Sequence, residues 1–203
     1  MMTLAPSDIV HAFKTSLLTP RQGARIILAQ RIGLTESWML LALAAVLSGL
    51  FGELVLQLAL PAVAVQPDPS SVDAIVRQVA ASPLRFTLFQ FLLMGAGAIL
   101  TFRLGRAAGG TGDMEQSLVL ISWLQILVLV LQAAILVLVI AVPMVGAVLS
   151  VLVPVMTARI LTLFVTELHG FKSPWLVFFA IVVSFFGLCI AMSVVLVLLG
   201  FGG

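Results

Sequence analysis

Residues 103–132 read RLGRAAGGTGDMEQSLVLISWLQILVLVLQ, and this segment sets the architecture of the whole chain. It begins with Arg103 and Arg106, passes through the glycine-rich turn Gly109-Gly110-Thr111-Gly112, and then enters a long apolar run. A helix needs about 20 mostly apolar residues to cross a bilayer, and this run supplies them. Two further apolar segments lie on each side of it. The pattern therefore predicts the middle of a bundle of membrane-spanning helices.

The composition of the full chain supports a membrane protein. Hydrophobic residues make up 62% of the 203 residues and charged residues only 9%, whereas a soluble domain needs far more charge on its surface. We predict an all-α, polytopic integral membrane protein whose residues 36–203 form one transmembrane domain. The five expected spans are 37–60, 84–102, 117–140, 145–165 and 175–199.

The first 35 residues are expected to form a short amphipathic and basic cytoplasmic segment. Ile9, Phe13 and Leu17 recur every four residues, as on one face of a helix, and Thr19-Pro20 interrupts that pattern. The apolar face can lie on an anionic leaflet or pack under the helix bundle, and we favour contact with the lipid surface. The candidate lipid contacts are Lys14, Arg21, Arg25 and Arg31.

Basic residues predict the orientation, because cytoplasmic loops are enriched in Lys and Arg. The N-terminal segment and the loops after the second and fourth spans carry most of them, whereas the outer side has Arg77 and Arg85. We expect a cytoplasmic N-terminus and an external or periplasmic C-terminus in a cell (inner) membrane. A short helix with Ile75, Val76 and Val79 along one side is expected in the external loop 62–83.

Five charged or amide side chains inside the predicted spans are the candidates for a structural or functional role. At a rise of ~1.5 Å per residue they form two layers, so an ion pair between Glu53 and Arg159 is not expected. Glu53 is expected to bond Gln90 or Gln132, and Arg159 to bond Gln125 or extend toward the headgroups. Such groups either fix helix pairing or line a path for a proton, an ion or a lipid headgroup. We favour helix pairing.

No pattern of catalytic, cofactor-binding or metal-ligating residues is present in the sequence. The glycine turn is followed by no Lys-Ser or Lys-Thr pair and follows an apolar helix, so it is not a phosphate-binding loop. His11 and His169 are isolated, and no spacing of Cys, His or carboxylates suggests a metal site. Asp113 instead caps the third span, with Gln116 completing a capping box. We expect a protein that is not an enzyme and needs no cofactor.

Three short segments resemble the Yip family of membrane proteins, in its bacterial branch. They are Leu18-Thr19-Pro20 with Ala24-Arg25, Gly109–Asp113 with Ser122–Gln125, and Glu167–Phe171. In eukaryotes the resemblance implies five helices, a cytoplasmic N-terminal region, Rab GTPase interaction and a role in vesicle trafficking. Bacteria lack Rab proteins, so the resemblance implies the topology of this chain more than its activity.

Two functions follow as hypotheses. The first is a non-enzymatic bundle that binds or organises other membrane components: the bilayer itself, anionic lipid at the cytoplasmic face, a second copy or another membrane protein, but no nucleic acid. The alternative is a transporter or lipid translocator that uses a polar path through the bundle. In that alternative the path is lined by Glu53, Gln90, Gln125, Gln132 and Arg159.

Overall fold

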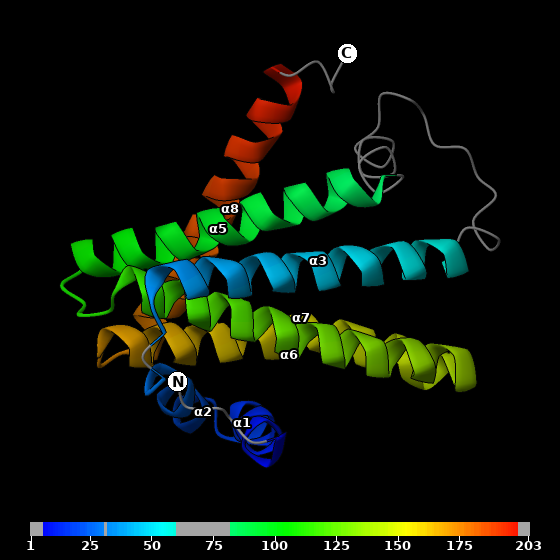
Figure 1. Cartoon of the computed structure of the whole chain (residues 1–203), viewed down its shortest axis with the longest axis horizontal. Coiled ribbons are helices and arrows are strands. Elements are labelled where there is room, and N and C mark those ends of the chain that lie inside the picture. Colours follow the sequence, from blue (N-terminus) through cyan, green and yellow to red (C-terminus); the bar gives the residue numbers. More distant parts are fainter. Residues whose placement is uncertain (1–5, 31, 60–81, 199–203) are drawn as a thin grey trace.

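The computed structural model describes residues 6–30, 32–59 and 82–198, and every regular element in this part of the chain is an α-helix (Figure 1). The all-α prediction is therefore confirmed. Two short helices precede five long ones. Their bounds are α1 Pro6–Leu18, α2 Pro20–Leu28, α3 Leu34–Ala59, α5 Pro83–Ala107, α6 Met114–Ala141, α7 Pro143–His169 and α8 Pro174–Leu198.

The five long helices are each able to cross a bilayer. They hold between 25 and 28 residues, which at ~1.5 Å per residue exceeds the ~30 Å hydrocarbon core. Each also contains an apolar window that qualifies as a membrane span. The chain is a polytopic membrane protein with five spans, each matching one of the predicted segments. Most of the observed helix ends lie a few residues past the predicted limits, because the helices continue beyond the apolar run into polar turns, as at the end of α5 and the start of α6.

Local sequence explains where α6 and α7 begin and end. The amide of Asp113 donates to Oε1 of Gln116 over 3.1 Å, and the reciprocal bond completes the predicted capping box. Pro143 begins α7 at a position where its missing N–H costs nothing. Gly170 ends α7 with a φ of +68°, a left-handed conformation that glycine adopts without steric cost.

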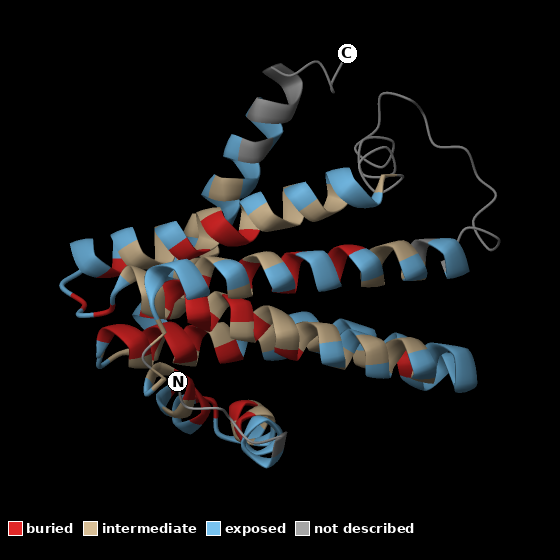
Figure 2. Cartoon of the chain, viewed as in Figure 1, coloured by how far each residue is buried: buried red, intermediate tan, exposed pale blue. Residues whose placement is uncertain are grey.

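The core lies at one end of the bundle, where α6 is packed between two groups of helices (Figure 2). On one side α6 contacts α3 and α5, and on the other it contacts α7 and the N-terminal helix α2. Toward the α6–α7 hairpin the same helices expose most of their side chains. The first core contains Leu41, Ala44, Ala45, Met94, Ala98 and Leu118, and the second contains Ala24, Leu120, Leu124, Leu127, Ile160, Phe164 and Leu168.

The α1–α2 pair packs under the bundle by its apolar face. Ala12 and Ile27 are buried together with Val119 of α6, and Phe13 and Leu17 pack against the α6–α7 core. From the sequence we favoured contact of this face with lipid over packing under the bundle. The structure shows the second arrangement: the apolar face packs against α6 and α7. The expected helix around Ile75–Val79 lies outside the described residues.

The last helix, α8, diverges from the other four long helices (Figure 1). Its principal packing partner is α7, from which it departs after the turn at Gly170–Ser173. Of its residues Val177 is buried, but Trp175, Leu176, Phe179 and Phe186 are more than half exposed. A helix this apolar and this exposed is stable only because lipid or another membrane component covers it.

Candidate functional site

His169, the last residue of α7, holds the glycine turn against the bundle. Its side chain is 2% exposed, and its Nδ1 accepts a hydrogen bond of 3.2 Å from the amide of Gly112. Because Nδ1 is the acceptor, a neutral ring carries its proton on Nε2, which lies 3.1 Å from the carbonyl of Thr101 on α5. The amide of Thr111 donates to the His169 carbonyl over 3.3 Å. One residue thus joins α7 to both sides of the α5–α6 turn.

Three glycines make room for this imidazole. A Cβ added at Gly105 or Gly110 would collide with the ring, and one added at Gly112 would lie 2.7 Å from Leu168 and 2.9 Å from His169. The glycines are therefore required by close approach of backbone to a side chain. Phe171 stacks on the open side of the ring, with the ring centroids 5.4 Å apart.

The N-terminal helices reach the same end of the bundle. The indole of Trp123 on α6 donates to Ser16 Oγ on α1 over 3.0 Å, and Ser16 is fully buried. Gly23 of α2 lies against the backbone of Ser16, where a Cβ would be 2.5 Å from the Ser16 Cα. This contact lets the two short helices pack closely enough to present one apolar face to α6 and α7.

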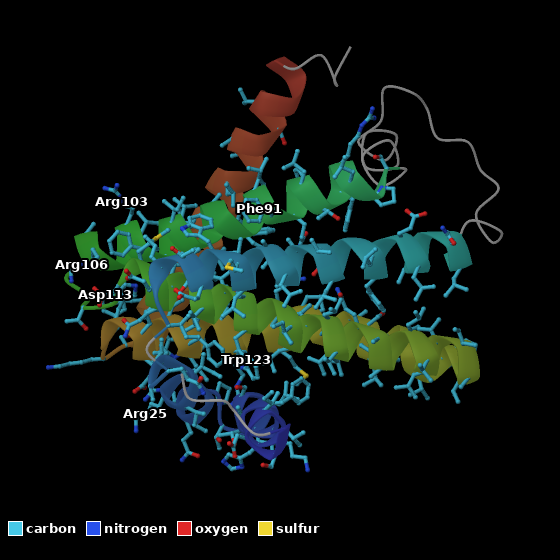
Figure 3. The ribbon with its side chains drawn as sticks, in the orientation of Figure 1. Arg25, Phe91, Arg103, Arg106, Asp113 and Trp123 are labelled. Atoms are coloured by element: carbon cyan, nitrogen blue, oxygen red, sulfur yellow. The ribbon has the colours of Figure 1, made fainter. Side chains whose placement is uncertain are left out.

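An ion pair joins α2 to the end of α7. Arg25 Nε lies 2.6 Å from Glu167 Oε1, with the Arg25 side chain 69% exposed. Glu167 raises the pKa of Arg25 chiefly through this hydrogen bond, so the guanidinium stays charged. Because Arg25 is so exposed, the ion pair adds little to the free energy of unfolding. Its main effect is to orient α2 relative to the end of α7. Figure 3 shows Arg25 beneath the bundle end that carries Arg103, Arg106 and Asp113.

The three segments that carry the Yip resemblance meet at this end, which we call the junction. We define it by Ser16 and Arg25 from the N-terminal pair, Gly112 and Trp123 from the middle segment, and His169 from the last. Nothing in the sequence connects His169 with the glycine turn, because His169 and Gly112 are 57 residues apart. The available signal was weak: four glycines within the eight residues 105–112, and a histidine followed by a glycine at a helix end.

The polar groups at the centre of the junction are engaged in contacts between its segments. Both ring nitrogens of His169 are occupied by backbone groups, so the imidazole has no free nitrogen with which to accept a proton from a substrate. Among the described residues no group of three His, Cys, Asp or Glu side chains comes close enough to hold a metal ion. Cys189 lies far along α8 and is exposed.

Gln125 is the one predicted intramembrane polar residue that joins two helices. Its Nε2 donates to Ser48 Oγ on α3 over 2.9 Å, and Ser48 Oγ donates in turn to the Ala44 carbonyl over 2.7 Å. The expected bond to Arg159 is not formed, because Gln125 faces α3 whereas Arg159 is exposed on α7. Gln125 therefore lies in a helix interface.

The other four polar residues are not brought together. Glu53 Oε1 accepts from Gln57 of its own helix over 2.8 Å, and Glu53 Oε2 is buried with no partner among the described residues. Gln90 is half-buried, and Gln132, like Arg159, is exposed on the outer surface of the bundle. Glu53 thus bonds neither Gln90 nor Gln132, since its nearest partner is one turn along α3.

The candidate lipid-contacting residues are placed on the short helices. Lys14 on α1 and Arg21 on α2 are exposed, Arg25 is held by Glu167, and Arg31 lies outside the described residues. Lys14 and Arg21 are free to meet a lipid surface, and this contact stays a prediction.

An open apolar cleft separates α8 from α5. It has a volume of about 560 Å³, with α6 and α7 forming its floor through Ile121, Leu161 and Val165. Its walls include Leu104 of α5 and Leu176 and Phe185 of α8, which are 47%, 73% and 59% exposed. The cleft therefore opens toward the surroundings of the bundle. Phe171, stacked on His169, contributes to the lining and connects the cleft to the junction.

Comparison with known proteins gives no relative: no family model, no curated protein and no solved structure matches this chain. The resemblance to the Yip family accordingly stays a prediction.

Proposed function

We propose that this protein is a non-enzymatic membrane protein of Yip type that binds or organises other membrane components through the cleft between α5 and α8. The cleft is the observation that carries the proposal. Packed helices leave few voids larger than a water molecule, and apolar concave sites of several hundred Å³ are where proteins bind ligands. A cleft of about 560 Å³ beside a well-packed core is therefore a binding site.

The surroundings of the cleft decide what class of molecule enters it. It lies between two apolar helices long enough to span a bilayer, so the molecules available to it are lipids and other membrane proteins. Water is excluded because the lining offers it few polar partners. Membership of the Yip type is supported by the convergence of the three resembling segments at the junction.

Photo-crosslinking in native membranes tests this function. A photoreactive phenylalanine analogue is placed at Leu176, which lines the cleft, and at Leu50, which is 61% exposed on α3 and outside it. We expect a discrete adduct, identified by mass spectrometry as a lipid or a protein, at position 176 in excess of position 50. Equal and diffuse labelling at both positions would contradict the proposal.

The transport alternative is favoured by one observation, the Oε2 atom of Glu53, which is buried without a partner among the described residues. Proteoliposomes containing the protein would then show proton flux or lipid scrambling that Glu53→Gln abolishes while Glu36→Gln, the same change at an exposed position in the first turn of α3, does not. Wild-type liposomes no leakier than empty ones would exclude this alternative.

A further inference from the structure

The cleft between α5 and α8 has the length of one leaflet. Its lining on α8 extends from Leu176 to Leu188 and on α5 from Ala108 to Gly97, which at ~1.5 Å per residue gives ~18 Å and ~17 Å. Half of the hydrocarbon core of a bilayer is ~15 Å. The cleft therefore begins at one membrane surface and ends near the middle of the bilayer.

A hydrocarbon chain suits the surface and the length of this cleft. The lining is almost wholly apolar, and the cleft is open along its side toward the surroundings of the bundle, so a flexible chain can enter it directly from the bilayer.

The chemistry of the lining changes from one end to the other. Along its length the cleft is bounded by apolar and small side chains such as Leu100, Val165, Ala180 and Leu188. At its mouth lies Lys172, the only charged residue among the described residues that line it. Lys172 is exposed and forms no ion pair with any described residue. A cation at the mouth of an apolar slot complements a molecule with one anionic end and one hydrocarbon end.

The same end of the bundle carries further exposed cations and is the end that we predict to be cytoplasmic. Arg103 and Arg106 are exposed there in the last turns of α5 (Figure 3). Cytoplasmic leaflets carry anionic lipids, and basic residues near the surface attract them. Glu167, the acidic residue nearest in sequence to Lys172, is already paired with Arg25.

From this arrangement we propose that the cleft binds one acyl chain of an anionic phospholipid of the cytoplasmic leaflet, with its phosphate held by Lys172. The inference rests on the proposed function and names the component that the cleft takes. The junction keeps the site open: His169 fixes the end of α7 to α5, Phe171 stacks on His169, and α8 starts three residues later on a diverging course.

Two pairs of matched variants test the site. Lys172→Gln removes the cation at the mouth, and Arg85→Gln removes an exposed cation of α5 that does not line the cleft. Gly97→Trp fills the cleft, since an added Cβ at Gly97 meets nothing within 4 Å. Gly187→Trp adds the same side chain to α8 at an equally open position that does not line the cleft.

The measurement is native mass spectrometry of the full-length protein titrated with phosphatidylglycerol or with phosphatidylcholine of the same chains. We expect one retained phosphatidylglycerol, about fivefold weaker retention in Lys172→Gln, as expected from one lysine near an anionic lipid, and none in Gly97→Trp. Arg85→Gln and Gly187→Trp should behave as wild type. Thermal unfolding of each variant shows whether Gly97→Trp is folded. If it is not, the smaller substitution Gly97→Leu is used in its place.

Three outcomes would overturn the inference. Unchanged retention in Gly97→Trp would place the lipid elsewhere, and equal retention of both lipids with no effect of Lys172→Gln would remove the headgroup contact. A dimer, or an adduct to a protein at position 176, with no retained lipid would assign the cleft to a protein. These results would leave the proposed function standing, whereas absence of both lipid and crosslink would end both proposals.

Discussion

At the scale of single residues, His169 does more for the fold than its isolation in the sequence suggests. It closes a contact among α5, the glycine turn and the end of α7, using both ring nitrogens and its own carbonyl. The surrounding glycines are small because the ring occupies the space that their side chains would take. A short, glycine-rich turn becomes a fixed element through this one side chain.

Replacing His169 tests that statement. We expect His169→Ala to lower the free energy of unfolding by about 2 kcal/mol, because it leaves the buried Gly112 amide without its acceptor and opens a cavity beside the turn. His11→Ala, a change at the exposed histidine of α1, should have no measurable effect. Thermal unfolding in mild detergent measures both. Equal free energies of unfolding for the two variants would show that the contacts of the His169 ring do not stabilise the fold.

At the scale of elements, the N-terminal helix pair is attached to the bundle by a hydrogen bond and an apolar face. We expect Trp123→Phe to keep the ring packing but to lose the bond to buried Ser16, which costs about 1 kcal/mol and loosens α1 and α2. Hydrogen exchange of residues 6–30 would rise. Trp175→Phe is the control, because Trp175 is 69% exposed on α8. Unchanged exchange in Trp123→Phe would mean that apolar packing alone attaches the pair.

Two glutamines of α6, Gln125 and Gln132, distinguish the two roles considered for the intramembrane polar residues, which are helix pairing and a polar path. Gln125→Leu should destabilise the bundle by about 0.6 kcal/mol, a usual value for a hydrogen bond between membrane helices, because it removes the bond to Ser48. Gln132→Leu should leave stability unchanged or raise it, because Gln132 is exposed where lipid surrounds α6. Unfolding titrations in bicelles compare the two. A loss of stability in Gln132→Leu would point to a partner for that side chain.

At the scale of the whole molecule, the distribution of charge predicts one orientation in the membrane. In a Cys189→Ser background, Met144→Cys places a thiol on the α6–α7 hairpin, at a position 81% exposed, and Thr111→Cys places one in the exposed part of the glycine turn. A membrane-impermeant maleimide applied to intact cells should label position 144 at once and position 111 only after permeabilisation. The reverse pattern would invert the orientation and place the mouth of the cleft outside.

The sequence by itself determined the five spans, the break at Thr19-Pro20 and the capping box at Asp113. These features depend on residues close together in the chain, through the number of apolar residues needed to cross a bilayer and the hydrogen bonds of a helix end. It also supplied the segments that meet at the junction, without indicating that they meet.

Only the tertiary structure decided which side chains face one another. It placed His169 in the glycine turn, turned Gln125 toward Ser48, left Gln132 and Arg159 on the outer surface, and separated α8 from α5 by a cleft. In a chain this apolar, every face of a helix can meet either lipid or protein, so hydrophobic periodicity does not mark the buried side. Helix rotation and partner choice depend on small residues and on a few hydrogen bonds across long sequence separations. Those contacts exist only once the helices are packed.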